Sequence, residues 1–191
     1  MFTGIIKKVG VIHSWNAKSR ILGIKSEFDS LILGESISCS GVCLTVSSFE
    51  KDIFFCNLSS ETVSKTNFKL KKEGDKLNLE KSLKIGEELS GHLVFGHVDG
   101  ISTLNDLKND KDSWILNFSI PSDLSKYLTN KCSVCIDGIS LTVNKVNRES
   151  FNISIVPFTW ENTNLKFSDV GDKFNIEIDM LARYVFKALN K

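Results

Sequence analysis

Short runs rich in Val, Ile, Phe and Thr alternate with polar positions along the whole chain, and Gly, Asn, Asp and Ser separate them. Runs of this kind at intervals of roughly eight to twelve residues are typical of an all-β sandwich or barrel. In the first half, the pattern predicts strands at residues 4–14, 21–25, 36–39, 44–49, 53–58 and 76–80. In the second half, it predicts strands at residues 98–104, 114–120, 131–136, 141–146, 150–155 and 173–179.

The two halves carry the same landmarks in the same order. Residues 37–46 read ISCSGVCLTV, and residues 134–143, about 97 positions later, read VCIDGISLTV. Residues 74–80 (GDKLNLE) and 171–177 (GDKFNIE) keep this spacing. Solenoids need about three or more units, so a long unit present twice indicates a duplicated domain. We expect one domain over residues 1–92 and a second over residues 93–189.

Each half is expected to close into a barrel, because closure of short antiparallel strands leaves no exposed strand edge. The predicted fold class is all-β, with two tandem six-stranded antiparallel β-barrels and a C-terminal α-helix. Short helices are predicted within the halves at residues 26–31, 60–66, 122–128 and 159–164. The polar segment 105–113 predicts a hairpin tip longer than its counterpart near residues 16–19.

The last segment, residues 180–191, has a different period and no counterpart in the first half. Its apolar residues fall on one face of a helix over about residues 180–190. They are Leu181, Tyr184, Val185, Ala188 and Leu189. This helix could cap the second barrel or pack against the same helix of other subunits. An addition outside the duplicated unit favours assembly.

Charge and composition exclude several classes of protein. A net charge of +1 gives no field that would gather nucleic acid or an anionic membrane. No apolar stretch approaches the roughly 18–20 residues of a membrane span. Two lysines, Lys7 and Lys8, stand where a signal peptide needs its apolar region. We therefore expect a cytoplasmic protein.

The five cysteines are interpreted as reduced thiols, since an odd number leaves one unpaired in any disulfide scheme. Cys132 and Cys135 form a C-x-x-C pair, which raises a zinc or redox hypothesis. The run CSVCIDG alternates like a strand that ends in a turn, and it has no second C-x-x-C partner. Small buried hydrophobes are therefore the favoured interpretation over metal ligands.

The nucleophile elbow, the phosphate-binding loop, the HExxH zinc motif and the dinucleotide fingerprint are all absent. Matching polar positions of the repeats remain. Cys43 corresponds to Ser140, and Thr45 to Thr142. Residues two apart on a strand share a face, so each pair forms a small polar patch, unless that face simply meets water.

Two histidines, His92 and His97, lie where the halves join, in GHLVFGHVDG. Histidine is the usual acid or base near neutral pH, although a lone histidine is more often structural.

An ordered set of motifs resembles the riboflavin synthase family of alpha-chain type, which carries the lumazine-binding repeat. The motifs are MFTG at the start, GVCLTV at 41–46, SSET at 59–62, SGHLVFGH at 90–97, IDGISLTV at 136–143 and NIEID at 175–179. The resemblance implies two six-stranded barrels and a C-terminal helix that forms a homotrimer. It also implies a cofactor-free dismutation, in which two molecules of 6,7-dimethyl-8-ribityllumazine give riboflavin and 5-amino-6-ribitylaminouracil. Lumazine synthase is a further partner to consider.

The resemblance also implies substrate sites between subunits, with one barrel from each. His97 is the candidate for proton transfer, Cys43 or Ser140 for activation of the partner ring, and Asp179 for the ribityl hydroxyls. The implied substrate contacts are Gly4, Ile5, Ile6, Ser36, Cys43, Leu44, Thr45, Asn57, Leu58, Ser59, Ser60, Glu61, Thr62, Gly96, His97, Val98, Lys131, Ser140, Leu141, Thr142, Val156, Pro157, Phe158, Thr159, Trp160, Glu161 and Asp179. No metal is expected.

One departure from the family pattern concerns Phe95, where a small residue often precedes Gly-His. The bulky ring is expected to alter the shape of the site. The rival reading is a noncatalytic lumazine- or flavin-binding antenna protein of the same architecture. Such proteins tend to lose the Gly-His of the second half and the cysteine of the first, and this chain keeps Gly96-His97 and Cys43. The enzyme is therefore the favoured hypothesis.

Overall fold

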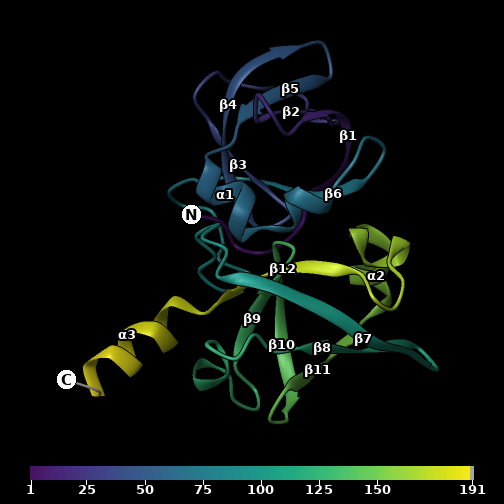
Figure 1. The fold of residues 1–191 in the computed structure, drawn as a ribbon, viewed down its shortest axis with the longest axis vertical. Coiled ribbons are helices and arrows are strands. Elements are labelled where there is room, and N and C mark those ends of the chain that lie inside the picture. The colour runs from purple at the N-terminus through teal and green to yellow at the C-terminus, as the bar shows by residue number, and fades with distance from the viewer. Residues whose placement is uncertain (190–191) are drawn as a thin grey trace.

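The computed structural model describes residues 1–189, which form two closed six-stranded barrels and a helix that projects from the second barrel (Figure 1). The first barrel consists of β1 (Lys8–Asn16), β2 (Ile21–Lys25), β3 (Ser36–Cys39), β4 (Val42–Glu50), β5 (Ile53–Asn57) and β6 (Lys76–Lys81). The second consists of β7 (Gly100–Asp110), β8 (Ser113–Ser119), β9 (Ser133–Ile136), β10 (Ile139–Val146), β11 (Ser150–Ile155) and β12 (Lys173–Ile178). The predicted fold class is confirmed.

Both barrels have the same topology. Around the ring, the first runs β1-β2-β5-β4-β3-β6, and the second runs β7-β8-β11-β10-β9-β12, with every pairing antiparallel. A register shift between Val46 and Ser48 in β4 recurs between Val143 and Lys145 in β10. Bulges of this kind bend strands and increase their twist, which helps short strands to close.

Each barrel has its own apolar core, built from alternate residues of its strands. Phe54 and Leu79 belong to the first core, and Phe118 and Phe151 to the second; all four are fully buried. Phe118 stacks on Phe151 with ring centroids 5.8 Å apart. The apolar positions that alternate along the strands therefore form two separate cores, one in each barrel.

The helices predicted after the fifth strand of each half are confirmed as α1 (Ser60–Lys65) and α2 (Pro157–Asn162). Each leads into a short 3₁₀ turn, η1 (Asn67–Leu70) or η3 (Asn164–Phe167). Ser59 caps α1, because its hydroxyl accepts a hydrogen bond from the Thr62 amide (3.0 Å). The second helix begins two residues before the predicted start, with Pro157 in its first turn.

The other two short helices were predicted wrongly. Residues 26–31 are not helical, and residues 122–128 contain only the 3₁₀ turn η2 (Ser125–Tyr127). In the first case the Ser26 amide donates to the Asp52 carbonyl (2.8 Å) while Phe28 and Leu31 pack against the core. In the second, Leu124 and Leu128 both enter the core. Tertiary packing overrides the local helix signal in both segments, which are too short to nucleate a helix unaided.

The segment 105–113 is largely strand rather than a polar tip. β7 continues to Asp110, which pairs with Ser113 of β8. Leu107 and Trp114 pack against the second core from this extension, so the polar residues that suggested a loop are interspersed with apolar ones that hold it in the sheet.

A polar seam of four asparagines and one aspartate joins the barrels. Asn78 and Asn164 exchange hydrogen bonds of 2.7 and 2.8 Å, and the Asn67 amide donates to Asn175 Oδ1 (2.7 Å). Asp137 accepts from Asn164 Nδ2 and from the Asn175 amide, both at 2.7 Å. Burial raises the pKa of the Asp137 carboxyl. Asn67 and Asn164 occupy equivalent positions of the repeat, as do Asn78 and Asn175. The duplicated sequence therefore also supplies the asparagines that join its two copies.

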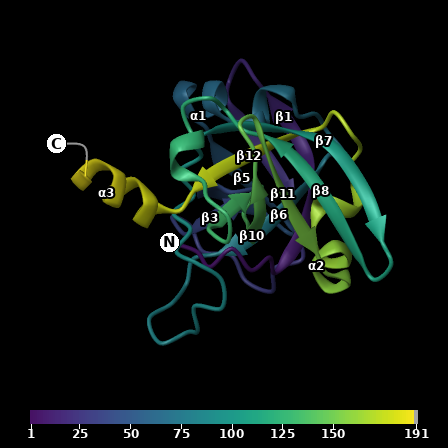
Figure 2. The ribbon, with the colours of Figure 1, turned by 90° about the horizontal axis from the view of Figure 1, so that it is seen from below.

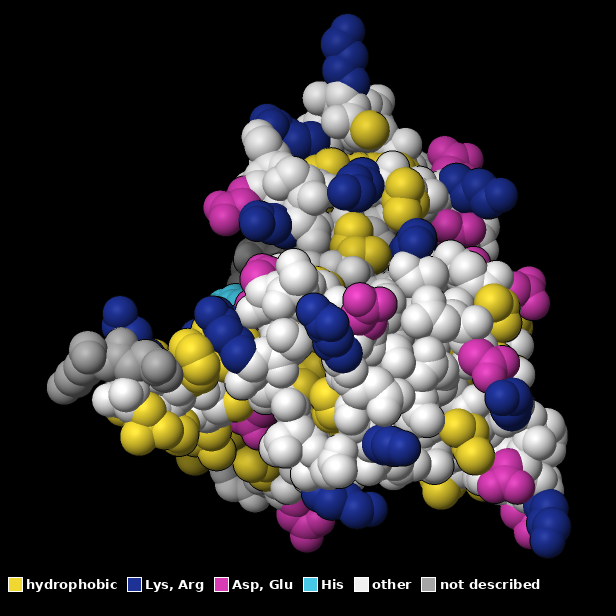
Figure 3. All heavy atoms as spheres, turned by 60° about the horizontal axis from the view of Figure 1, so that its bottom comes forward, with side chains coloured by type: hydrophobic (Ala, Val, Ile, Leu, Met, Phe, Trp, Pro, Cys, Tyr) yellow, Lys and Arg dark blue, Asp and Glu magenta, His cyan; other side chains and the backbone are white. Residues whose placement is uncertain are grey.

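The terminal helix α3 (Met180–Leu189) stands away from both barrels (Figure 2). It is held at its base, where Arg183 pairs with Asp99 and the ring of Phe186 meets that of Tyr127 edge-on. Figure 3 shows hydrophobic side chains gathered along the projecting helix. Four of them are 58–80% exposed, namely Leu181, Tyr184, Val185 and Leu189. The helix therefore does not bury its apolar stripe against its own barrel.

The division of the chain at residues 92 and 93 and an oligomeric role for α3 stay predictions. Among the described residues, no helix has the length and apolar character required to cross a membrane.

Candidate active site

The opening segment of each half crosses to the opposite barrel. The Ser140 amide of β10 donates to the Gly4 carbonyl (2.8 Å), and the Cys43 amide of β4 donates to the Gly96 carbonyl (3.0 Å). The sequence prediction placed residues 4–7 and 98–99 in strands of their own half, so β1 and β7 begin later than expected. The physical reason is the crossing itself. The Gly4 carbonyl bonds to the Ser140 amide of the other barrel, and the chain rejoins its own barrel only at Lys7, whose amide donates to the Leu79 carbonyl (3.1 Å). In the second half the chain rejoins its barrel at Asp99, whose amide donates to the Ile176 carbonyl (2.8 Å).

Side chains of the crossing segments also pack against the opposite barrel. Ile6 packs against the second core, and Val98 packs against the first. Between the crossing segments, Phe2 and Val94 form an antiparallel bridge with N···O distances of 2.7 and 3.1 Å. Each candidate site therefore combines residues from both halves of the chain.

We call the two combinations the Cys43 site and the Ser140 site. The Cys43 site comprises Cys43 and Thr45 with the crossing segment 96–98. The Ser140 site comprises Ser140 and Thr142 with the crossing segment 4–6. In both, the cysteine or serine is half-buried and the threonine is exposed, as the strand alternation predicted.

Glycine is required at both crossing points. Gly4 and Gly96 each have a φ of +75°, which L side chains rarely adopt. A Cβ on Gly4 would lie 2.6 Å from Ser140 Cβ, and one on Gly96 would lie 2.6 Å from Cys43 Cβ. The backbone can contact the Cys43 and Ser140 side chains only because glycine, which has no side chain, stands at both crossing points.

A buried glutamate holds each crossing segment. Glu80 of β6 accepts from the Thr3 amide (2.8 Å), the Thr3 hydroxyl (2.6 Å) and the Gly4 amide (3.0 Å). Glu177 of β12, at the equivalent repeat position, accepts from the amides of Phe95, Gly96 and His97 at 2.8, 2.9 and 3.0 Å. Burial raises the pKa of both carboxyls, that of Glu177 to about 7, against the opposing effect of these donors.

Ser140 has a histidine partner. His92 Nδ1 and Ser140 Oγ lie 2.7 Å apart, and the His92 amide donates to the Thr3 carbonyl (3.2 Å). Burial lowers the pKa of His92, and the charge of Asp179 opposes that shift. The lowered pKa favours the neutral imidazole, which can accept a proton through the serine or directly.

Cys43 has a different environment. Its neighbours Cys39 and Cys56 are buried, and burial raises the pKa of both thiols, that of Cys56 to about 12. Among residues 1–189, no imidazole is hydrogen-bonded to Cys43, and Cys43 packs instead against the small cluster of Phe2 and Val94. The equivalent repeat positions thus carry different chemistry.

His97, the sequence candidate for proton transfer, lies elsewhere. Its backbone is fixed by Glu177, but its side chain is exposed and its ring centroid lies 5.9 Å from that of Phe95. The structure does not bring the His97 ring to Ser140, and its catalytic role stays a prediction. His92, which the sequence singled out only as one of two junction histidines, is the one in contact with Ser140. No local signal in the sequence distinguished it from His97, because its partner is 48 residues away.

The remaining expected contacts lie at the ends of neighbouring elements. Residues 57–62 run from the end of β5 into α1, and residues 156–161 run into α2. The rings of Trp160 and Trp114 stack with centroids 4.6 Å apart. Ser36 pairs with Thr45 across β3 and β4, Lys131 has a φ of +70°, and Asp179 accepts from the Leu181 amide at the start of α3.

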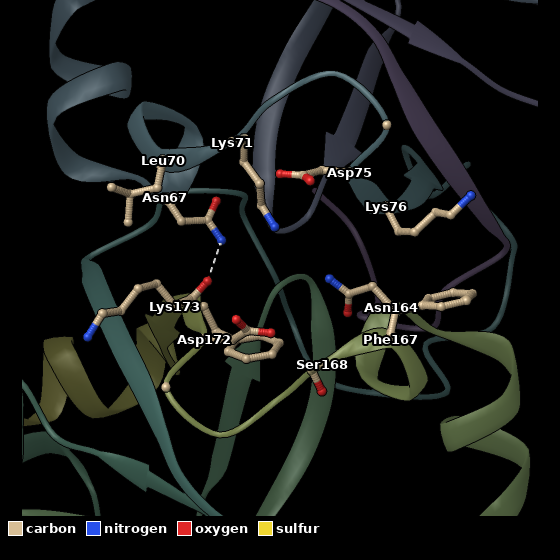
Figure 4. Close-up of a pocket in the computed structure, with 13 residues that line it drawn as sticks. Asn67, Leu70, Lys71, Asp75, Lys76, Asn164, Phe167, Ser168, Asp172 and Lys173 are labelled. Carbon is tan, nitrogen blue, oxygen red and sulfur yellow. Dashed lines mark hydrogen bonds between the residues drawn. The ribbon is translucent and has the colours of Figure 1, made fainter.

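A cleft of about 440 Å³ lies elsewhere, between the barrels (Figure 4). Several of its residues occupy equivalent repeat positions, such as Asn67 with Asn164 and Asp75 with Asp172. The lining consists of Asn67, Leu70, Lys71, Gly74, Asp75, Lys76, Asn164, Phe167, Ser168, Gly171, Asp172, Lys173 and Phe174. None of the predicted site residues is among them, so this cleft is distinct from the two sites.

Within residues 1–189, no three His, Cys, Asp or Glu side chains gather as metal ligands would. The five cysteines are free thiols, and Cys135 is fully enclosed while Cys132 is half-buried.

Comparison with known proteins agrees with the fold and the repeat. The lumazine binding domain matches residues 3–82 and 95–179. Riboflavin synthase of Photobacterium phosphoreum is 40% identical over 99% of this chain and 89% of its own length. Riboflavin synthase of Brucella abortus (strain 2308) is 40% identical over 96% of each chain. The crystal structure of LumP complexed with riboflavin superposes with a TM-score of 0.85 at 22% identity and covers 93% of this chain and 99% of that chain.

The fold and the exchanged sites define a protein with two tandem lumazine-binding barrels. Within that class, the chain belongs to the riboflavin synthase family.

Proposed function

We propose that the chain is an active riboflavin synthase, which converts two molecules of 6,7-dimethyl-8-ribityllumazine into riboflavin and 5-amino-6-(D-ribitylamino)uracil. One lumazine donates a four-carbon unit and the other accepts it, so atoms and electrons balance without an external oxidant or cofactor. The observation that carries this proposal is the pair of equivalent sites with unequal chemistry. Two copies of one substrate need similar sites, and their opposite roles need a difference between those sites.

The Ser140 site is proposed to manage proton transfer. His92, neutral and 2.7 Å from Ser140 Oγ, can take up a proton through the serine hydroxyl. The lumazine 7-methyl group is acidic, because the ring delocalises the resulting carbanion, so a base of modest strength suffices. His97 remains a second candidate for this step if a substrate or another chain approaches its exposed ring.

The Cys43 site is proposed to hold the partner lumazine, with the thiol positioned to activate or add to its ring. Backbone groups of residues 57–62 and 156–161 would form hydrogen bonds with the polar edges of the two ring systems. Asp179 would orient ribityl hydroxyls. Alignment of the two rings can supply up to about 7–11 kcal/mol of the barrier.

The complete site is proposed to lie between subunits of a homotrimer. The support is α3, which keeps an apolar face exposed although it is anchored at its base. A first barrel of one subunit facing a second barrel of the next would bring a Cys43 site to a Ser140 site. A cytoplasmic location and an association with lumazine synthase are further proposals; free thiols fit a reducing compartment.

The rival function is lumazine or flavin binding without turnover. Retention of Cys43 and of the Ser140–His92 pair favours the enzyme. Incubation of the purified protein with dimethylribityllumazine, followed by riboflavin absorbance, tests the proposal. We expect turnover; tight lumazine binding without riboflavin formation would contradict it.

A further inference from the structure

Two buried glutamates bind the crossing segments of the two sites but are not themselves among the site residues. Glu177 is 3% exposed and Glu80 is 2% exposed, and they occupy the same position in the repeated segments GDKFNIE and GDKLNLE. Neither is paired with a lysine or arginine within hydrogen-bonding distance in the described part of the chain. Their partners are instead the crossing segments.

The geometry around Glu177 links the second barrel to the Cys43 site. Both oxygens are used, since Oε1 accepts from the Phe95 amide and Oε2 accepts from the amides of Gly96 and His97. The carbonyl of Gly96, in the same segment, accepts from the Cys43 amide at 3.0 Å. A carboxylate in the second barrel therefore fixes the backbone that meets Cys43 in the first.

Glu80 forms the reciprocal connection. It binds the amides of Thr3 and Gly4, and the Gly4 carbonyl accepts from the Ser140 amide at 2.8 Å. The difference lies in the third donor. On Glu80 it is the Thr3 hydroxyl, whereas on Glu177 it is a third backbone amide. The crossing segment of the Cys43 site is thus held by main-chain groups alone.

Resting on the proposed function, we propose that Glu177 is a positioning residue for the Cys43 site, and Glu80 its counterpart for the Ser140 site. Each carboxylate orders the backbone edge that a bound lumazine or flavin contacts. Three converging amides need an acceptor with two equivalent oxygens. A glutamine turns an amide N–H₂ toward one of these donors, so the segment must shift although the side-chain volume is conserved.

The test uses Glu177→Gln and Glu80→Gln in the full-length chain, with the exposed Glu73→Gln as the matched control. Riboflavin is the probe. Its stoichiometry per chain is measured by calorimetry, and occupancy of the Cys43 site is measured as protection of Cys43 from iodoacetamide, located by peptide mass. Cys39, Cys56 and Cys135 are buried, and the other half-buried thiol, Cys132, is separated from Cys43 by its peptide mass.

We expect Glu177→Gln to weaken riboflavin protection of Cys43 by about tenfold or more, the scale of one lost charge-assisted hydrogen bond, while the Ser140 site keeps its ligand. Glu80→Gln should show the reverse, with Cys43 still protected and the other equivalent of riboflavin weakened. Glu73→Gln should match the wild type. This reciprocal pattern separates positioning from a general loss of structure, which would weaken both sites together.

Unchanged protection of Cys43 in Glu177→Gln, or an equal loss at both sites in either variant, would overturn the inference. If Glu177→Gln does not fold, Glu177→Asp carries the same test, because it keeps the charge but is one methylene too short to reach all three amides. A wild-type chain that binds no riboflavin would overturn the proposed function itself, and the inference with it.

Discussion

The Cys43 site and the Ser140 site share one backbone arrangement but carry different side chains. Each joins a strand of one barrel to a glycine-containing segment of the other, and each segment is held by a buried glutamate. Only the Ser140 site has a hydrogen-bonded imidazole, His92, among the described residues. Duplication therefore supplies the shared architecture. The difference between Cys43 and Ser140, together with the His92 imidazole beside Ser140, supplies the asymmetry that a reaction between two identical substrates requires.

The largest expected effect comes from disruption of the proposed homotrimer. Deletion of residues 180–191 should dissociate the oligomer and abolish turnover while both barrels remain folded, because the exposed apolar face of α3 is lost. Sedimentation and circular dichroism measure the two properties, and Lys187→Ala on the same helix is the control. A truncated monomer with full turnover would show that the two sites do not need a neighbouring subunit.

Ser140→Ala and Cys43→Ala should each reduce turnover by about 10²–10⁴-fold, the scale for a lost acid–base or nucleophilic group. Ligand affinity should change little, because the backbone contacts at both sites persist. Steady-state kinetics and riboflavin titration separate these quantities. Equal losses of binding and turnover would assign the two side chains to binding rather than to chemistry.

His92→Gln should lower turnover by about 10²-fold and alter the pH profile, because it removes the base beside Ser140. In the wild type, kcat should fall on the acid side as His92 becomes protonated, below the ordinary histidine pKa, since burial lowers the pKa of His92. The exposed His13→Gln serves as the control. If the acid limb instead disappears in His97→Gln, the histidine chosen from the sequence carries the proton.

The last prediction concerns stability and not turnover. Burial raises the pKa of Glu177 from 4.5 to about 7, so its contribution to folding is fully present below pH 4.5 and is lost as the pH rises to about 7. The free energy of unfolding of wild type minus that of Glu177→Gln should fall by about 3 kcal/mol across this window, at about 1.4 kcal/mol per pKa unit. Urea unfolding at pH 4.5 and pH 8 measures it, and a flat difference would contradict the raised pKa.

Much of the fold was predictable because the strands obey local rules. Alternation located the strands, and the repeat required two similar units. The helices predicted at 26–31 and 122–128 are wrong where Phe28 packs against the first core and Leu124 is buried in the second. The local sequence pattern does not indicate which residues pack against a distant part of the chain.

The sequence predicted several residues of the two sites, but it did not predict which segments of the chain meet there. Cys43 and Ser140 emerged from the repeat alignment, yet nothing local indicated that Gly4 would lie on Ser140 or Gly96 on Cys43, because those contacts join segments that are distant in the chain. The sequence named His92 with His97 but did not indicate its contact with Ser140, since these two residues are 48 positions apart. Glu80 and Glu177 stood inside the repeated motif, where their equivalence was visible but their role was not.

The most direct test of the account is complementation between the two sites. Cys43→Ala and Ser140→Ala chains, each inactive alone, are refolded together, hybrid oligomers are confirmed by mass, and riboflavin formation is assayed. If one active site unites a Cys43 site and a Ser140 site from different chains, about one quarter of the contacts will pair two intact sites, and a corresponding fraction of wild-type activity should return. A mixture that forms hybrids but stays as inactive as its parents would contradict the account.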